Sequence, residues 1–375
     1  MNKKNKILIG TIVMVGVILV AGLFCGILFT QESTSVSRKL NENVSMESEK
    51  KQEQEQDQLE REESDEEKND ELREVFGKEV FDEKEYYVDD EAVAREIIRL
   101  QGEAFRAEVS EDSEVREIEK NIEENCEMEA VNLQDLDLEM AQYVELACEY
   151  MYNRYPCLKG FLTNISVQED ISNSTGVIAL YDTGTFLFPP ESDNVYPFTI
   201  KRQVLLNAED FYRPKRIKNM ITRCVREGHW RENTSVTSIF VHELTHCLID
   251  RLVCEEYGLG TSICITEENG DAFGACATQD LADNQTMEKE ICNTAYKNYL
   301  TEQGEECTYE EFCLQISGYA VGTQDDGGIS YGETISEAMT DVYINGENCT
   351  LASRAIIDEV ETRLIKLNLE VNEIQ

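Results

Sequence analysis

Hydrophobic and polar positions divide the chain of 375 residues into three parts. Residues 7–30 form an uncharged, mostly apolar run of the length that spans a bilayer. Residues 31–130 are mostly polar, although the stretch 91–105 has the apolar spacing of a helix. Residues 131–375 contain apolar positions at helix and strand spacings, and this part is long enough for one globular domain.

The last part predicts an α+β domain that is mainly helical with a small sheet. Helical apolar spacing occurs in seven segments, at 134–155, 206–226, 236–257, 285–300, 308–318, 333–344 and 350–368. β-forming residues cluster at 161–167 and 176–182 on either side of the turn sequence SNSTG, which predicts a β-hairpin. Shorter strands are predicted within 184–190 and 196–201.

Charges at the start of the chain give the apolar run an orientation. Lys3, Lys4 and Lys6 precede it, and the positive-inside rule then leaves the N-terminus in the cytosol. We therefore expect a single-pass signal anchor in the cell membrane, in contact with lipid through residues 7–30, and an extracellular C-terminal domain. A cleaved signal peptide is the alternative, but the apolar core is long for one and no small-x-small cleavage site follows it.

Acidic charge is concentrated between the anchor and the domain. The chain has 76 acidic and 34 basic residues, a net charge of −42, and residues 31–130 alone contribute 35 acidic and 14 basic residues, or −21. Such a segment predicts a solvated stalk, partly disordered or helical, that spaces the domain from the membrane. Attraction of basic peptides is the alternative role. Nucleic acid is not expected as a partner, because phosphate contacts need clustered lysine and arginine.

Two of the three histidines share one pentapeptide. His242 and His246 frame the sequence HELTH, so both imidazoles lie on one face of the predicted helix, with Glu243 beside them. The flanking residues are apolar nearly all round, which predicts a buried helix, and Thr234 or Ser235 is positioned to cap it. Buried imidazoles are costly without a partner. A zinc site therefore explains the pattern better than core histidines held by hydrogen bonds.

A catalytic zinc ion needs a third protein ligand and one open position. The segment 329–346 reads as a helix with three acids at four-residue intervals, Glu333, Glu337 and Asp341. Either Glu337 binds the metal and Asp341 orients a histidine, or Glu333 binds and Glu337 orients. His229, which lies upstream of the motif, is a less favoured donor.

HELTH followed by SEAMTD resembles the gluzincin metallopeptidases, typified by thermolysin, whose pattern is H-E-x-x-H and then E-x-x-x-D. This resemblance favours Glu337 with Asp341. A wider resemblance, to the catalytic domain of anthrax lethal factor and to the zincins of phage head proteins, takes in residues 155–166, EGHWRENTSV, ISGYA and the E-x-x-S-E-A run. Matching that run selects Glu333, whereas matching the tyrosine element SYG at 330–332 selects Glu337. We favour Glu337.

These resemblances imply a zincin-like fold, one zinc ion per chain and hydrolysis of a peptide or protein substrate. Glu243 is then the general base that takes a proton from zinc-activated water. Tyr331, or alternatively Tyr319 of ISGYA, would donate a hydrogen bond to the oxyanion. An edge strand of the sheet is expected to hold the substrate backbone by strand addition.

The spacing of the motif differs from that of thermolysin. Ninety residues separate His246 from Glu337, so we expect an insertion at about 258–328. A catalytically silent or toxin-like binding module with the same fold is the alternative function, and a structural zinc staple is a third. The presence of Glu243 favours the enzyme, because a binding module needs no base and structural sites are closed by four ligands.

Thirteen cysteines are present, twelve of them after the anchor, and an even number in an exported domain predicts disulfides. Six lie in the insertion or beyond the third-ligand helix: Cys264, Cys276, Cys292, Cys307, Cys313 and Cys349. Cys247 and Cys254 are expected as small buried residues of the motif helix. No CxxC pair occurs, so a separate zinc knuckle is not expected.

Overall fold

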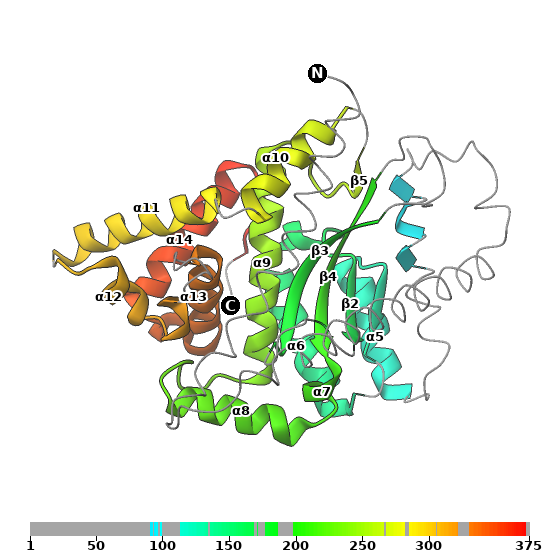
Figure 1. Ribbon diagram of the computed structural model, residues 1–375, viewed down its shortest axis with the longest axis horizontal. Coiled ribbons are helices and arrows are strands. Elements are labelled where there is room, and N and C mark those ends of the chain that lie inside the picture. The colour runs from blue at the N-terminus through cyan, green and yellow to red at the C-terminus, as the bar shows by residue number, and fades with distance from the viewer. Residues whose placement is uncertain are drawn as a thin grey trace, which may run out of the picture. The chain divides into compact units, whose positions relative to one another are not determined.

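The part of the chain that the computed structural model describes is residues 91–92, 94–96, 98–99, 113–133, 136–168, 171, 177–186, 198–265, 268–281, 285–304, 306–321 and 330–372 (Figure 1). The anchor predicted at 7–30 and most of the stalk lie outside these residues. Within the described ranges, no helix combines the length and the apolar character needed to cross a membrane.

Five strands form one mixed sheet in the order β1-β2-β4-β3, with β5 paired to β4. Their bounds are β1 Ala130–Asn132, β2 Asn164–Gln168, β3 Ala179–Phe186, β4 Phe198–Asn207 and β5 Cys264–Ile265. β1, β2 and β4 are parallel, whereas β3 and β5 are antiparallel to β4. β4 is therefore the centre of the sheet, and its Val204 and Leu206 are fully buried.

The predicted hairpin between 161–167 and 176–182 is wrong, because β4 lies between β2 and β3. β3 pairs with β4 over eight positions, whereas β2 is only five residues long. The longer ladder satisfies more backbone donors and acceptors than a β2–β3 pair would. As a result β3 lies at the edge of the described sheet.

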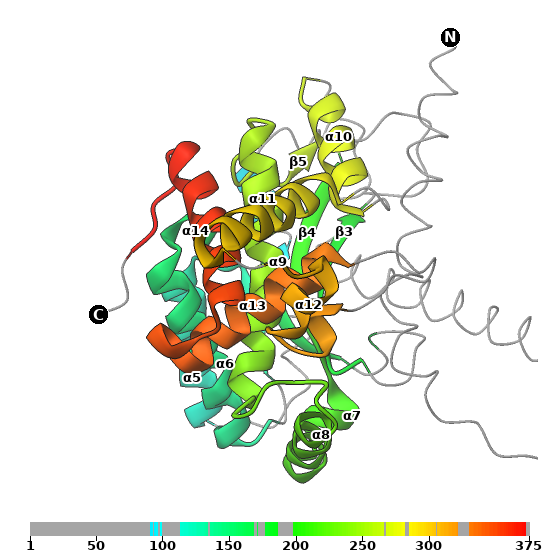
Figure 2. The ribbon, with the colours of Figure 1, turned by 90° about the vertical axis from the view of Figure 1, so that its left-hand side faces the viewer.

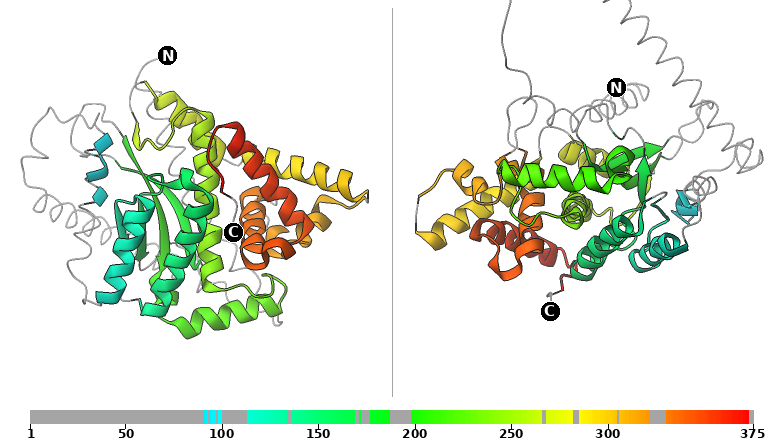
Figure 3. Two further views of the ribbon diagram at one scale, coloured as in Figure 1. Left: turned by 180° about the vertical axis from the view of Figure 1, so that it is seen from behind. Right: turned by 90° about the horizontal axis from the view of Figure 1, so that it is seen from below.

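Helices pack on both sides of α9 (Val236–Glu256). The sheet, α5 (Ser113–Cys126) and α6 (Leu138–Arg154) lie on one side of it (Figures 1 and 3). On the other side α13 (Tyr331–Asn345) packs on α9 and on α14 (Leu351–Lys366), and α11 (Thr286–Gln303) and α12 (Tyr309–Leu314) complete this half (Figure 2). The structure is thus mainly helical with a small mixed sheet, as predicted.

The motif helix α9 is buried over almost its whole length, as its apolar sequence predicts. Ser235 caps its first turn, and the side chains of Ser235 and Ser238 each accept a hydrogen bond from the other residue's backbone N–H. By contrast, the single helix predicted at 206–226 is two helices, α7 (Ala208–Phe211) and α8 (Pro214–Arg226). Pro214 separates them because proline cannot donate the backbone hydrogen bond of a helix interior.

The fold begins before the boundary that we predicted at residue 130. Ile118 and Ile122 of α5 belong to the main core. Further upstream, Ala94 and Ile98 are buried together with Ile263, so the apolar positions described within 91–99 do pack on the fold. The predicted stalk therefore contains residues of the globular part.

The segment between α9 and α13 contains β5, α10 (Gly270–Leu281), α11, α12 and the short 3-10 helix η2 (Tyr319–Val321). Helix α10 was not predicted. Its sequence GDAFGACATQDL begins with glycine and has a second one in the next turn, which lowers its intrinsic helix propensity. Contact of α10 with α9 stabilises it instead.

Candidate metal centre

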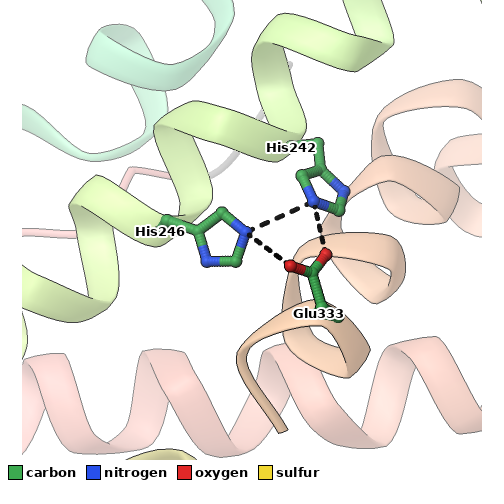
Figure 4. Close-up of side chains that lie close together, drawn as sticks. All are labelled: His242, His246 and Glu333. Atoms are coloured by element: carbon green, nitrogen blue, oxygen red, sulfur yellow. Dashed lines mark hydrogen bonds and ion pairs between the residues drawn. The ribbon is translucent and has the colours of Figure 1, made fainter. Parts of the chain in front are cut away.

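The candidate centre lies where α9 and α13 cross. His242 and His246 are one turn apart on α9, and Glu333 comes from the first turn of α13 (Figure 4). One donor atom from each of these three residues lies within 4.8 Å of the other two. Packing of α13 on α9 therefore brings together His242 and Glu333, which lie 91 positions apart in the sequence.

The distances show a convergent set of donor atoms. The Nε2 atoms of His242 and His246 are 3.3 Å apart. The Glu333 carboxylate lies 2.9 Å from Nε2 of His242 and 3.8 Å from Nε2 of His246. Two imidazole nitrogens facing each other at this distance need a proton or a cation between them, because their lone pairs repel each other. Two histidines and one carboxylate are a donor set that catalytic zinc uses.

Glu337 takes a different place from the one that we favoured. Its Oε1 lies 3.1 Å from Nδ1 of His242, on the far side of that ring from Glu333. A carboxylate at Nδ1 accepts the N–H there and leaves Nε2 as the metal-binding nitrogen. The structure thus has the second of the two arrangements, in which Glu333 joins the histidines and Glu337 orients one of them.

Asp341 is fully buried one turn beyond Glu337, and it binds the start of α14. It accepts hydrogen bonds from the backbone N–H and hydroxyl of Thr350, from the Ser353 hydroxyl and from the Asn345 amide. Arg231 forms an ion pair with it at 3.3 Å. The orienting role expected for Asp341 therefore belongs to Glu337, because α13 places residue 337, not 341, beside His242.

Glu243, the expected base, is buried and points to the sheet edge. Its Oε2 accepts a hydrogen bond of 2.8 Å from the backbone N–H of Tyr181 in β3. The backbone carbonyl of Ile178 points in the opposite direction, towards β4, where it accepts a hydrogen bond from the N–H of Asn207. Since backbone groups alternate along a strand, Tyr181 belongs to the set of residues whose N–H and C=O point away from β4. The base is thus fixed on the outer edge of β3.

Tyr319, the alternative oxyanion donor of the sequence analysis, lies at the centre. Its ring centroid is 5.9 Å from that of His242, and its side chain contributes to the lowered pKa of Glu333. Tyr331, the preferred one, instead packs on Tyr309 with ring centroids 6.0 Å apart. The third histidine, His229, lies 4.9 Å from Tyr319, ring to ring, and is not one of the three clustered donors.

A close approach of two glycines fixes the segment that carries Tyr319. The N–H of Gly318 donates to the carbonyl of Gly228, and the N–H of Tyr319 donates to the carbonyl of His229. A Cβ at Gly318 would lie 2.4 Å from the Gly228 oxygen, so the contact requires glycine. The segments EGHW and ISGYA, which carry part of the wider resemblance, thus pair with each other beside the centre.

Burial and neighbouring charges shift the pKa values of Glu243, of both histidines of the motif and of Glu333. Burial raises the pKa of Glu243 to about 7, and the Glu333 charge adds to the rise while that of His242 opposes it. Burial lowers the pKa of His246 to about 4. For His242, the hydrogen bonds that its ring N–H groups donate to Glu333 and Glu337 outweigh burial and raise its pKa. For Glu333, the interactions with both histidines outweigh burial and lower its pKa to about 2.

A buried polar network behind the base was missed by sequence reasoning. The Tyr181 hydroxyl donates to Asp250, and the Arg202 guanidinium lies 3.4 Å from the same carboxylate. Asp250 follows His242 and His246 at the same four-residue interval, so its position on the motif face was visible in the sequence. Tyr181 and Arg202 gave no such signal, because their role depends on the pairing of β3 with β4.

The twelve described cysteines are not joined in disulfides in the structure, and the expected disulfides remain a prediction. Cys247 and Cys254 are buried in α9, as expected.

No known protein family, curated protein or solved structure matches the chain.

Proposed function

We propose that the chain is a zinc-dependent endopeptidase of zincin type, with His242, His246 and Glu333 as the metal ligands. The observation that carries the proposal is the convergence of these three donors beside a buried carboxylate, Glu243, that is held on the edge of the sheet. A structural zinc site would be closed by a fourth protein ligand, whereas three ligands with a neighbouring base are typical of a hydrolytic site.

Zinc, when bound, lowers the pKa of a coordinated water towards neutrality and polarises a carbonyl group. Glu243 takes the proton from the water and returns it to the leaving amine. Its pKa of about 7 in the metal-free protein suits a group that must both accept and return a proton. Glu337 holds Nδ1 of His242, which keeps Nε2 directed at the metal.

Tyr319 replaces Tyr331 as the proposed oxyanion donor, because its ring lies 5.9 Å from that of His242 and its side chain contributes to the lowered pKa of Glu333. The substrate would lie along the outer edge of β3 as an added strand. The choice of this edge is supported by the position of Glu243, which the N–H of Tyr181 holds on the side of β3 that faces away from β4. An extended peptide there would bring its backbone next to the base and the metal.

The location at the cell surface is part of the same proposal. It rests on the apolar run 7–30 and the three lysines before it. Protease treatment of intact cells that produce the full chain should remove the C-terminal domain and spare a cytosolic control protein. A C-terminal domain that is degraded only after the cells are lysed would contradict this location.

Metal content and hydrolysis of the purified full chain test the proposed activity. We expect about one zinc per chain in the wild type. Glu333→Ala should lose the metal, whereas Glu337→Ala should retain the ligands and bind zinc about 10- to 100-fold more weakly. Glu243→Gln, the matched control, should keep zinc and lose at least about 100-fold in hydrolysis of a fluorogenic peptide pool.

Two outcomes would contradict the proposal. A folded wild type without zinc would refute the metal centre. A Glu243→Gln variant that hydrolyses peptides at the wild-type rate would show that another group acts as base.

A further inference from the structure

A second cluster of donor atoms lies two turns along the same helix. Asp250 and Cys254 of α9 meet Cys276 of α10, and all three residues are buried. The Sγ atoms of Cys254 and Cys276 are 3.4 Å apart. The Cys254 thiol also lies 3.5 Å from Oδ1 of Asp250.

We propose that Cys254 and Cys276 form a disulfide that ties α10 to the motif helix. A disulfide bond is about 2.05 Å long, so the two sulfur atoms need to approach by only about 1.4 Å, which small side-chain rotations supply. The two residues lie 22 positions apart, and the bond would enclose β5 and the connection to α10. The inference does not depend on the proposed peptidase activity.

The charges around the cluster favour a disulfide over a metal ion. Arg202 is almost fully buried, and its guanidinium lies 3.4 Å from Asp250 and 3.5 Å from Sγ of Cys254. This cation already balances the carboxylate. A divalent ion would have to bind next to the guanidinium, whereas a disulfide is neutral and leaves the pair of Arg202 and Asp250 intact.

The reaction needs an external disulfide as oxidant, the kind of compound that maintains an oxidising compartment. One of the two cysteines attacks the external disulfide as a thiolate and forms a mixed disulfide. The other cysteine, after losing its proton, displaces the external thiol. In total two protein thiols lose two protons and two electrons, and the external disulfide is reduced to two thiols.

Peptide mapping of the full chain distinguishes this pair from other cysteines. Cys264 lies between Cys254 and Cys276, and a glutamate-specific protease separates these three, because Glu255, Glu256, Glu267 and Glu268 provide cleavage sites between them. Trypsin is added because it cleaves after Arg251 and so separates Cys247 from Cys254. The chain is equilibrated with oxidised and reduced glutathione, alkylated, digested and analysed by mass spectrometry. We expect one cross-linked pair of peptides that carries Cys254 and Cys276 and separates on reduction.

Two variants sharpen the experiment. Cys264→Ser, the matched control, should retain the cross-linked pair, and Cys276→Ser should abolish it and leave Cys254 alkylated. The inference is overturned if wild-type Cys254 and Cys276 are both alkylated, or if they are linked to other cysteines. It is also overturned if the two thiols become reactive only after chelation that releases a second metal ion per chain, because the cluster would then be a metal site.

Discussion

Two donor clusters on α9 share one geometry and differ in charge. His242 and His246 in the first, and Asp250 and Cys254 in the second, are pairs four residues apart that meet a third residue from another helix. The second cluster includes the guanidinium of Arg202, whereas the first is formed by two imidazoles and carboxylates. If the second cluster is a disulfide, as we propose, then donor spacing alone does not define a metal site, because the Arg202 cation already compensates the Asp250 carboxylate there.

Removal of the Arg202 guanidinium would leave the second cluster without its cation, and this change has the largest expected effect on stability. Arg202→Met leaves Asp250 buried without its cation, and we expect a loss of about 3–5 kcal/mol in the free energy of unfolding. The guanidinium carbon of Arg202 lies 4.0 Å from the centroid of the Phe161 ring, so methionine keeps side-chain volume over this ring but also removes a cation–π contact. Urea unfolding of the full chain measures the loss.

The double variant Arg202→Met/Asp250→Asn is the control for this loss. It removes both charges and should recover a large part of the stability. If the single variant is as stable as the wild type, the buried negative charge of Asp250 does not need the Arg202 cation as its counter-charge.

The stability of the metal-free protein should depend on pH through Glu243, which lies beside the first cluster. Because the pKa of Glu243 is raised from 4.5 to about 7, the folded state binds more protons than the unfolded chain between these pH values. Stability from this group therefore falls as pH rises through that window. Glu243→Gln should be equally stable near pH 4.5 and more stable than the wild type by up to about 3 kcal/mol at pH 8.

His246 contributes the opposite slope, because its lowered pKa makes the unfolded chain bind more protons between about 4 and 6.5. The contribution of His246 is common to the wild type and Glu243→Gln, so it cancels when their unfolding free energies are subtracted. This free-energy difference is measured from urea midpoints in the presence of a chelator, from pH 4.5 to pH 8. A difference that stays constant with pH would mean that Glu243 titrates normally.

Tyr181 connects the two clusters, and its side chain gives the smallest expected effect. Tyr181→Phe keeps the backbone N–H that holds Glu243 and removes the hydroxyl that donates to Asp250. We expect a loss of about 1.5 kcal/mol in unfolding free energy, since one hydrogen bond to a charged group is lost. Zinc affinity should be unchanged. A loss of zinc in this variant would show that the second cluster positions the metal ligands.

The sequence predicted most of the helices of the centre, because their signals are local. Apolar residues all round, a serine cap and the HELTH spacing identify α9, and the predicted helix 329–346 contains α13. The choice between Glu333 and Glu337 could not be predicted in the same way. Both lie on one face of α13, and only the position at which α13 crosses α9 decides which carboxylate reaches the Nε2 atoms.

The sheet shows the same limit. Strand segments were found from β-forming residues, but their order depends on a long-range choice of partner, and β4 took the place between β2 and β3. Tyr181 and Arg202 became neighbours of α9 only through that order. Their contribution to the site could therefore not be predicted from spacing.

The separation of 91 residues between His242 and Glu333 has a consequence for how the protein would mature. A metal ion that joined two such distant positions would act as a cross-link around β5 and helices α10, α11 and α12. Its binding free energy adds directly to the stability of the finished chain, because the unfolded chain offers no preformed site. Closing so long a loop costs only slightly more entropy than closing a shorter one, since the cost grows with the logarithm of length. If the proposed zinc centre is correct, zinc supply would thus determine when the newly made chain becomes resistant to unfolding.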